Sequence, residues 1–472
     1  MMSSAHIFNS AYRHATIAAL VASLTLSGCG LISDGATQAY DKVANGSWFW
    51  QGRHGALTEE ELEWASIAWQ YIDQNTDPKT GLVGGVNGYP TATMGNVAEY
   101  LASLHVAYQL GLVDHLAFDG RLSAVLHFLN TMDLFDNRVP NRVYHTQTTD
   151  MVNYANEPGE IGWSGLEVGR LLIWLNVFKR YYPPYGEYID KALLRWDFCA
   201  LLTPDGEIQS GYRQDNTIQI TQDGRLGYEE YAAYGYSLWG FNPMKADVLE
   251  PYQVFYIYGM PVLVDGRDPR VDGVPNPLVS TPFFDMGLEF NWDRWDDVSS
   301  GDKTHTRLDL ARQSEQLYRI QEARWRQDAI HTARAEHILS GSPWFLYDAI
   351  WAQGSLFASQ TDEGDFYDNK ALLSVKAAFL MWALWDTEYT DELMSLISPL
   401  HDPEKGWFEG RFEQSAGYEM ALSLPTNATV LKALLYKQQG KLLGAPYSSA
   451  RLEVVRANEF ELPGKCHPIQ LP

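Results

Sequence analysis

The sequence has few cysteines and few basic residues, and both shortages exclude classes of function. Only three cysteines occur among 472 residues, and no paired Cys/His spacing of a structural zinc site appears. Lys and Arg number 35 against 59 Asp and Glu, which gives a formal net charge of −24. Such acidity argues against nucleic acid as a partner and against anionic membrane surfaces. A neutral ligand is therefore expected.

Long apolar runs are also scarce. The run Ala15–Leu26 follows the basic Arg13 and is too short to span a membrane as a stable helix, so it predicts a secretory signal peptide. Leu26-Ser-Gly-Cys29 has the pattern of a bacterial lipoprotein signal. We therefore expect residues 1–28 to be removed and Cys29 to carry the lipid.

The residues after Cys29 suggest where the protein is anchored. Gly30 follows, not the Asp that favours inner-membrane retention, so the periplasmic face of the bacterial outer membrane is the expected location. Residues 29–46 are predicted to form the lipidated Cys and a tether. Cys199 and Cys466 remain, and an oxidising periplasm permits a disulfide between them.

No Gly/Ser-rich or Pro-rich linker follows the tether, so residues 47–472 are predicted to form a single domain. Apolar residues recur with a 3.6-residue period in about twelve segments. Twelve helices in six hairpins close into an (α/α)6 toroid, so we predict an all-α fold with long aromatic-rich loops. The expected helices cover residues 58–75, 92–111, 114–132, 162–181, 184–202, 227–241, 306–338, 345–358, 369–386, 388–397, 414–422 and 426–438.

A weak internal repeat supports the hairpins. A turn, a short extended stretch and an apolar helix follow one another from Asp77, from Thr203 and from Asp402. Loops of exceptional length separate other helices, and such loops are usually functional or disordered. They cover residues 133–161, 203–226 and 242–305. The last is rich in aromatic residues, which argues against disorder and for an ordered cover over one face of the toroid.

Carboxylates and aromatic rings gather at the start of two expected helices. Glu160 stands near Trp163 before one helix, and Glu229 and Glu230 open another. A sugar-cleaving cleft needs this combination, because one carboxyl protonates the leaving oxygen, another activates water or attacks, and rings stack on sugar faces. The alternative is that the acids cap helix N-termini above core aromatics.

Five segments carry a resemblance to a known family. They are Asn87–Pro90, Pro140–Tyr144, Glu157–Trp163, Gly227–Tyr231 and Pro343–Tyr347. Together they resemble a bacterial family known as domain of unknown function 3131, which is grouped with the six-hairpin glycosidases. The similar segments span most of residues 50–440. The resemblance implies a toroid that acts on a glycan.

The resemblance also bears on single residues. Glu229–Gly235 is similar to the helix that bears a catalytic acid in glycoamylase-like β-1,2-glucanases, and Glu230 is the closer match. In the family, Thr-Met is usually followed by Trp-Asp, whereas Gly95 and Asn96 follow Thr93-Met94 here. A carboxylate is thus missing at this point, which keeps a non-catalytic glycan-binding protein open.

We predict Glu230, then Glu229, as the general acid, and Glu160, followed by Asp285 and Glu419, as the second carboxylate. Partial burial against aromatic rings would raise the pKa of such an acid. Candidate substrate-binding residues are Tyr89, Asn141, Arg142, Trp163, Trp344 and Trp407. Core packing accounts equally well for each aromatic residue in this set.

Other chemistry is not indicated. No Gly-rich phosphate loop or nucleotide fingerprint occurs, so no cofactor is expected. An acidic cluster lacks the arrangement of a calcium loop and is better explained as surface acidity. Its members are Asp293, Asp296, Asp297 and Asp302.

We predict a lipid-anchored periplasmic glycoside hydrolase that acts on a bacterial exopolysaccharide or β-glucan through paired carboxylates. The alternative is a non-catalytic glycan-binding lipoprotein in polysaccharide export or assembly. A polysaccharide lyase is a third possibility, but lyases of uronates usually need basic residues, and the acidity of the chain counts against it.

Overall fold

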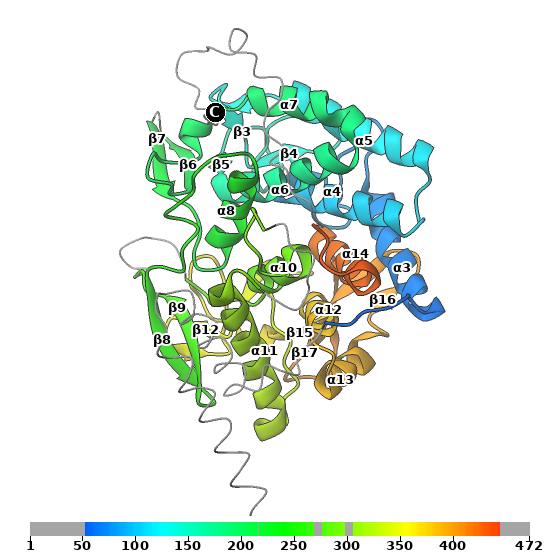
Figure 1. Ribbon diagram of the computed structural model, residues 1–472, viewed down its shortest axis with the longest axis vertical. Coiled ribbons are helices and arrows are strands. Elements are labelled where there is room, and N and C mark those ends of the chain that lie inside the picture. The colour runs from blue at the N-terminus through cyan, green and yellow to red at the C-terminus, as the bar shows by residue number, and fades with distance from the viewer. Residues whose placement is uncertain (1–51, 216, 269–275, 298–304, 444–472) are drawn as a thin grey trace, which may run out of the picture. The chain divides into compact units, whose positions relative to one another are not determined.

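The computed structural model describes residues 52–215, 217–268, 276–297 and 305–443. Six helices in it form a closed ring, in which each helix packs against the next and the last returns to the first (Figure 1). In ring order they are α4 (Met94–Gln109), α6 (Gly165–Tyr181), α8 (Tyr228–Leu238), α10 (Thr281–Phe290), α12 (Val375–Leu384) and α14 (Leu424–Gln439). The predicted toroid is therefore present. Within the described residues, no helix is both long and apolar enough to cross a membrane.

Five further helices lie around this ring (Figure 1). They are α3 (Glu59–Asn75), α5 (His115–Thr131), α7 (Gly186–Leu194), α11 (Leu308–Asp328) and α13 (Glu388–Ile397). In α13 the buried Tyr389, Leu393 and Ile397 recur every four residues, as expected for a helix that packs one face on a core. Between α8 and α10 the described part of the chain forms the hairpin β8–β9 (Tyr252–Ile257 and Met260–Asp265) and no outer helix.

The all-α prediction is not confirmed, because many short antiparallel strands accompany the helices. Three more pairs are β1 (Thr91–Thr93) with β4 (Val143–His145), β2 (Leu134–Phe135) with β3 (Val139–Pro140), and β12 (Trp351–Ala352) with β13 (Ser355–Leu356). The larger sheets join β5 (Gly162–Ser164), β6 (Gln209–Gln214) and β7 (Thr217–Gln222); β10 (His337–Ile338), β11 (Phe345–Asp348) and β14 (Ser359–Gln360); and β15 (Leu372–Ser374), β16 (His401–Asp402), β17 (Gly406–Phe412) and β18 (Tyr418–Leu422).

Four inner helices begin directly after a strand, and each begins at a Ser or Thr whose side chain accepts a backbone N–H of the first turn. The capping residues are Thr93 for α4, Ser164 for α6, Ser374 for α12 and Ser423 for α14. A hydroxyl in this position satisfies one of the free N–H groups of the helix start. The repeated order of strand, hydroxyl and helix brings the N-termini of the inner helices to one end of the ring.

Two predicted helices are wrong. Residues 345–358 form β11, β12 and β13, because Gln353 and Gly354 take positive φ angles of 48° and 87° and make the two-residue turn of a hairpin. Residues 414–422 end in β18, which pairs with β17. The predicted helix 306–338 is also too long, since α11 ends at Asp328.

One helix was missed, because α10 lies in the segment 242–305 that the sequence analysis assigned to a loop. Every residue of α10 is buried. A helix that is covered on all sides shows no polar face and hence no 3.6-residue period. The equally buried α12 was found because it has an uninterrupted apolar run, whereas Pro282, Asp285, Gly287 and Glu289 interrupt the sequence of α10.

Cys199 is disulfide-bonded. The other two cysteines, Cys29 and Cys466, lie outside the described residues, so the predicted Cys199–Cys466 pair remains a prediction. The predicted signal peptide, the lipid at Cys29 and the tether also fall outside them.

Helices α6 and α8 approach closely at two glycines. A Cβ atom built on Gly235 would lie 1.9 Å from the carbonyl oxygen of Gly169. We expect Gly235→Ala to lower the free energy of unfolding by about 1–3 kcal/mol, the usual cost of overpacking, measured by urea denaturation. The matched control is Gly120→Ala in α5, where a Cβ meets nothing within 4 Å, and it should be neutral or stabilise by up to about 1 kcal/mol. Equal effects of the two substitutions would contradict the close approach.

Candidate active site

A group of polar side chains from several segments meets at the N-terminal end of the inner helices. Three of them come from inner helices, and the others come from the segments that precede α6 and α12. We call this group the axial cluster. It comprises Arg142, Tyr154, Glu167, Tyr228, Glu336, Tyr347, Asp362 and Lys376.

Glu167 of α6 has the sequence position of a helix cap but does not act as one. In Ser164-Gly-Leu-Glu167 the hydroxyl of Ser164 accepts the backbone N–H of Glu167 at 3.3 Å. The return bond of a capping box, from the Glu carboxylate to the backbone of Ser164, is absent. Asp223 caps the helix end in its place, since its Oδ2 accepts the Ser164 hydroxyl at 2.7 Å and the Leu166 N–H at 3.2 Å. The Glu167 carboxyl is therefore free to point elsewhere.

That carboxyl lies against the start of the neighbouring inner helix α4. It is within hydrogen-bonding reach of the Thr93 hydroxyl and the Gly95 backbone, and a Cβ on Gly95 would lie 3.3 Å from its Oε1. Its Oε2 is buried and has no hydrogen-bond partner. Burial raises the pKa of Glu167 above its ordinary value, although Arg142 and Thr93 lower it. A carboxyl that stays protonated to higher pH and keeps one oxygen unpaired suits a general acid.

A second carboxyl lies near α12, which is three places from α6 in the ring of six and therefore opposite to it. Lys376, the second residue of α12, places its Nζ 3.0 Å from Oε1 of Glu336. Oε2 of Glu336 is buried and has no partner. Neighbouring helix axes are about 8–10 Å apart, so opposite axes in such a ring are roughly 16–20 Å apart. Long side chains that extend inward from the two sides could therefore flank a ligand near the axis.

Two tyrosines and a third carboxyl connect these two sides. The hydroxyl of Tyr347 donates a hydrogen bond to Asp362. Burial raises the pKa of Asp362, and this hydrogen bond lowers it. Tyr228 packs against the same small apolar cluster as Tyr347. Burial and then Glu336 raise the pKa of Tyr228 well above its ordinary value. The tyrosine hydroxyls are therefore neutral donors beside three carboxyls.

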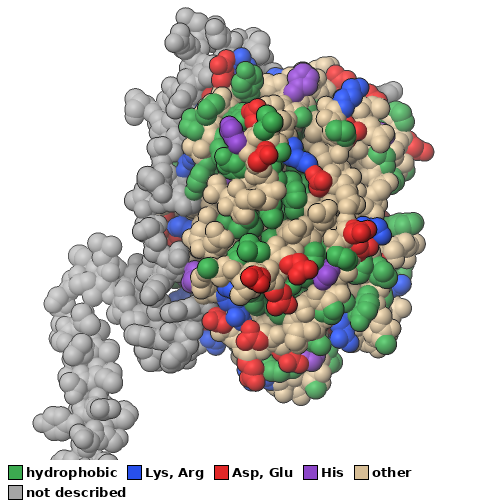
Figure 2. Space-filling view, turned by 90° about the vertical axis from the view of Figure 1, so that its right-hand side faces the viewer, with side chains coloured by type: hydrophobic (Ala, Val, Ile, Leu, Met, Phe, Trp, Pro, Cys, Tyr) green, Lys and Arg blue, Asp and Glu red, His purple; other side chains and the backbone are tan. Residues whose placement is uncertain are grey.

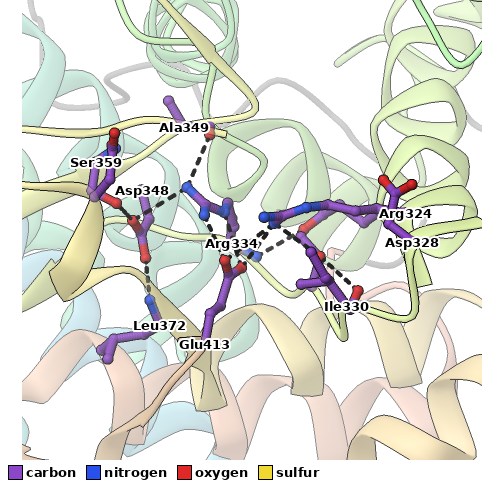
Figure 3. Close-up of polar contacts among 12 residues, drawn as sticks. Arg324, Asp328, Ile330, Arg334, Asp348, Ala349, Ser359, Leu372 and Glu413 are labelled. Carbon is purple, nitrogen blue, oxygen red and sulfur yellow. Dashed lines mark hydrogen bonds and ion pairs between the residues drawn. The ribbon is translucent and has the colours of Figure 1, made fainter. Parts of the chain in front are cut away.

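A buried ion network fixes the segment that carries Glu336 and Tyr347 (Figure 3). Arg334 places its Nη2 2.7 Å from Oε2 of Glu413, and Oδ2 of Asp348 accepts the backbone N–H of Leu372 at 2.7 Å. The side chains of all three charged residues are at most 1% exposed. Because Arg334 is two residues before Glu336 and Asp348 directly follows Tyr347, this network holds both site residues in place.

A second buried network forms the floor of the site. We call it the axial ion network; its members are Glu99, Arg170, Asp285, Glu289 and Lys432. Nζ of Lys432 lies 2.8 Å from Oδ1 of Asp285 and 2.8 Å from Oε1 of Glu289. Arg170 lies close enough to Tyr228 to lower its pKa. The network therefore reaches up to the axial cluster.

The predicted acids Glu229 and Glu230 do not lie in the axial cluster. Glu230 accepts the backbone N–H of Gly227 at 2.6 Å, as a helix cap does. Burial and then Glu229 raise the pKa of Glu230 well above its ordinary value. Its other oxygen has no partner and faces a cavity of about 20 Å³ beside Asp247 and Arg307. That volume is about enough for one water molecule.

Glu229 points to a different neighbour, since adjacent helix residues diverge by about 100°. Its Oε1 lies 2.6 Å from Nη1 of Arg267. Burial raises the pKa of Glu229 to about 7, although Arg267 lowers it. Neither glutamate therefore faces Glu336 across the ring.

The three residues predicted as the second carboxylate lie in different places, and none of them belongs to the axial cluster. Glu160 forms an ion pair of 2.7 Å with Arg213 and is partly exposed. Glu419 accepts the backbone N–H groups of Ser340 and Ala421. Asp285 belongs to the axial ion network, directly below the axial cluster.

The candidates for substrate binding divide into two groups. Tyr89 and Trp344 are exposed on loops that precede inner helices, to 38% and 64%, and Arg142 belongs to the axial cluster. The other three are buried and make structural hydrogen bonds. Asn141 accepts the Ile161 N–H at 3.0 Å, Trp163 donates to the Ala200 carbonyl at 3.1 Å, and Trp407 donates to the Trp64 carbonyl at 3.2 Å.

Several residues of the axial cluster were missed by sequence reasoning. For Glu167 a signal existed in the Ser-x-x-Glu spacing at the helix start, but the prediction for this helix start was Glu160. Tyr347 and its surroundings fell within a wrongly predicted helix, and nothing in the sequence marked Glu336 or Asp362.

Asn96, which stands where the family usually has Asp, completes the capping box of α4. Its side-chain oxygen accepts the Thr93 N–H at 3.0 Å. An amide oxygen fulfils this role as well as a carboxylate does, so the substitution leaves the helix start intact. No group of three or more metal-binding side chains occurs among the residues that the structure describes.

Comparison with known proteins identifies both a family and a fold. A family model described as a protein of unknown function, DUF3131, matches residues 63–440. No curated protein matches the sequence. The endo-β-1,2-glucanase from Chitinophaga pinensis, solved with sophorotriose and glucose, is 11% identical with a TM-score of 0.54, over 82% of this chain and 94% of that one.

Two further solved structures are similar to this chain in fold. The β-1,2-glucanase from Parabacteroides distasonis is 12% identical with a TM-score of 0.53, over 81% of this chain and 57% of that one. A candidate glucoamylase from Bacteroides fragilis is 12% identical with a TM-score of 0.56, over 84% and 96%. At these identities the likeness establishes the fold, which is that of the six-hairpin glycosidases.

Proposed function

Since this chain belongs to the DUF3131 family and has a glycosidase fold, we propose that it is a glycoside hydrolase of a neutral bacterial glycan, with β-1,2-glucan as the first substrate to test. The observation that carries the proposal is Glu167, a carboxyl with raised pKa and one unpaired oxygen at the N-terminal end of the ring. The proposed acid thus moves from Glu230 to Glu167. The glucanase neighbours support the choice of glycan by fold alone.

The axial cluster suggests how hydrolysis would proceed. Glu167 donates its proton to the glycosidic oxygen, and the bond from that oxygen to the anomeric carbon breaks. Glu336, on the opposite side, accepts a proton from water as the water oxygen bonds to the anomeric carbon. Asp362 is the second candidate for this base. Each turnover consumes one water, and the leaving sugar keeps the proton from Glu167.

We also propose that the enzyme is exported and anchored through a lipid on Cys29 at the periplasmic face of the outer membrane. The disulfide at Cys199 supports an oxidising compartment. The charge pattern agrees with a neutral substrate, since the chain carries 59 acidic against 35 basic residues, acidic side chains are spread over the face in Figure 2, and the excess negative charge would repel polyanions.

Incubation of the protein with bacterial polysaccharides, β-1,2-glucan included, in water enriched in oxygen-18 tests the proposal. We expect shorter sugars with one heavy oxygen at the new reducing end, read by mass spectrometry. Products lacking the elements of water would instead reveal a lyase. Retention of intact polymer without any product would favour the alternative, a glycan-binding lipoprotein.

The pH dependence of the reaction should respond to Arg142. Glu167 must be protonated to act, so activity falls as the pH rises through its pKa. The positive charge of Arg142 lowers that pKa, so Arg142→Met should raise it and move the alkaline limb of the kcat profile to higher pH. Arg326→Met, on the exposed face of α11, should leave the limb unchanged. A shift of the limb to lower pH in Arg142→Met would contradict the role of Glu167.

A further inference from the structure

A cavity of about 190 Å³ lies outside the axial cluster, beside the start of α8. Its polar lining comes from three segments: the turn before β6, the end of β7 with the start of α8, and the segments that flank the hairpin β8–β9. The polar lining residues are Glu207, Gln222, Glu229, Lys245, Glu250 and Arg267. One water needs only about 10–15 Å³ of such space, so the cavity admits a larger occupant.

The deepest wall of the cavity is built around Glu229, which is 3% exposed. Arg267 holds this carboxylate from one side, with Nη1 to Oε1 at 2.6 Å and Nη2 to Oε2 at 3.3 Å, and the Gln222 amide donates to Oε1. Arg225 in turn donates to the Gln222 carbonyl at 2.7 Å. The polar groups of this wall are therefore fixed before any ligand arrives.

The outer wall is more open. Lys245 places its Nζ 3.1 Å from Oε2 of Glu207 and is 54% exposed. Glu250 and Pro251 form the edge that leads into β8, whose first residue, Tyr252, is 47% exposed. A ligand can therefore enter past the exposed Lys245 side chain.

The chemistry of the lining excludes several ligands. Three carboxylates face two cations, which disfavours phosphate and other anions. The polar walls disfavour an apolar ligand, and no metal-binding group of three side chains occurs in the described part of the chain. The lining instead combines acceptors, which are Glu207, Glu229 and Glu250, with donors, which are Gln222, Lys245 and Arg267. Vicinal hydroxyls, each both donor and acceptor, match such a wall.

We propose that this cavity is a second, non-catalytic binding site that takes one neutral sugar ring. This proposal rests on the proposed function only for the expectation that the protein encounters a glycan. The evidence for the site itself is the lining of the cavity.

Equilibrium dialysis of the protein against labelled glucose tests the proposal. The double variant Lys245→Met/Glu207→Gln removes the charges of the outer wall, and we expect it to weaken the binding of one glucose per chain at least tenfold. The matched control is Lys191→Met/Glu187→Gln, an exposed ion pair of 2.7 Å on α7, which should bind glucose as the parent protein does. Glucose 6-phosphate should bind less tightly than glucose.

Two results would overturn the proposal: glucose binding that is equal in both double variants and the parent, or tighter binding of glucose 6-phosphate than of glucose. These results are independent of hydrolysis. If the parent protein cleaves no glycan but binds one glucose that the Lys245→Met/Glu207→Gln variant does not bind, the second binding site is supported and the proposed function fails. Hydrolysis by a parent protein that binds no glucose at the cavity would do the reverse.

Discussion

Glu167→Gln should lower kcat on the cleaved glycan by about 10²–10⁴-fold, the usual contribution of a general acid. Glutamine has the shape of the protonated carboxyl and can still accept the hydrogen bonds from Thr93 and Gly95, but it has no proton to give. Folding should therefore change little, and KM should change less than kcat. The measurement is steady-state kinetics on the substrate found in the screen, with circular dichroism to confirm that the variant is folded.

Glu230→Gln is the matched control, because it changes an equally buried glutamate at another inner-helix start. Glutamine preserves the bond from the Gly227 N–H, so we expect activity within about twofold of the parent. If Glu230→Gln abolished activity and Glu167→Gln did not, the acid would be Glu230, as the sequence alone suggested. This pair of variants therefore decides between the two assignments.

Lys432→Met should destabilise the protein by about 3–5 kcal/mol, because it removes one partner from a fully buried ion network. Lys432 is 0% exposed and lies 2.8 Å from both Asp285 and Glu289. Its loss leaves three carboxylates, including Glu99, with Arg170 as their remaining cation in the network. A lower urea midpoint with an unchanged m-value would show the effect.

Charge, not lost packing, should account for most of that cost. Adding Asp285→Asn to Lys432→Met removes one unpaired negative charge, so part of the stability should return. Lys191→Met, an exposed lysine on α7, should change the free energy of unfolding by less than about 0.5 kcal/mol. No recovery in the double variant would show that the methylene packing of Lys432 matters more than its charge.

Most helices with one polar face were predictable, and so was the fully buried α12, which has a long apolar run. Outer helices such as α3, α5 and α13 were found nearly to their ends, because their apolar residues recur with the helical period. Inner helix α10 was missed because Thr281–Phe290 is buried on all sides and its short sequence also lacks a long apolar run, whereas the equally buried α12 has such a run and was found. Residues 345–358 combine apolar content with a Gln-Gly turn, and the turn geometry prevailed over the periodicity.

The site was harder to predict than the fold. Carboxylates were predicted at the starts of two helices, and the N-terminal end of the inner helices does hold a cluster of carboxyls and tyrosines, although with other members. Its members Glu167, Glu336 and Asp362 are far apart in the sequence and meet only because of the ring. Trp163 and Trp407 were attractive as sugar platforms, but a sequence cannot tell a buried ring from an exposed one.

The N-terminal end of α6 can be capped by either of two carboxylates, that of Asp223 or that of Glu167. While Asp223 accepts hydrogen bonds from the N–H of Leu166 and the hydroxyl of Ser164, the Glu167 carboxyl takes no part in capping its own helix. Without the loop that carries Asp223, the Ser-x-x-Glu spacing lets Glu167 turn back and close its own helix. The free carboxyl of Glu167 therefore depends on a cap supplied by a different segment of the chain, so a change in the loop that carries Asp223 would be felt at the proposed acid.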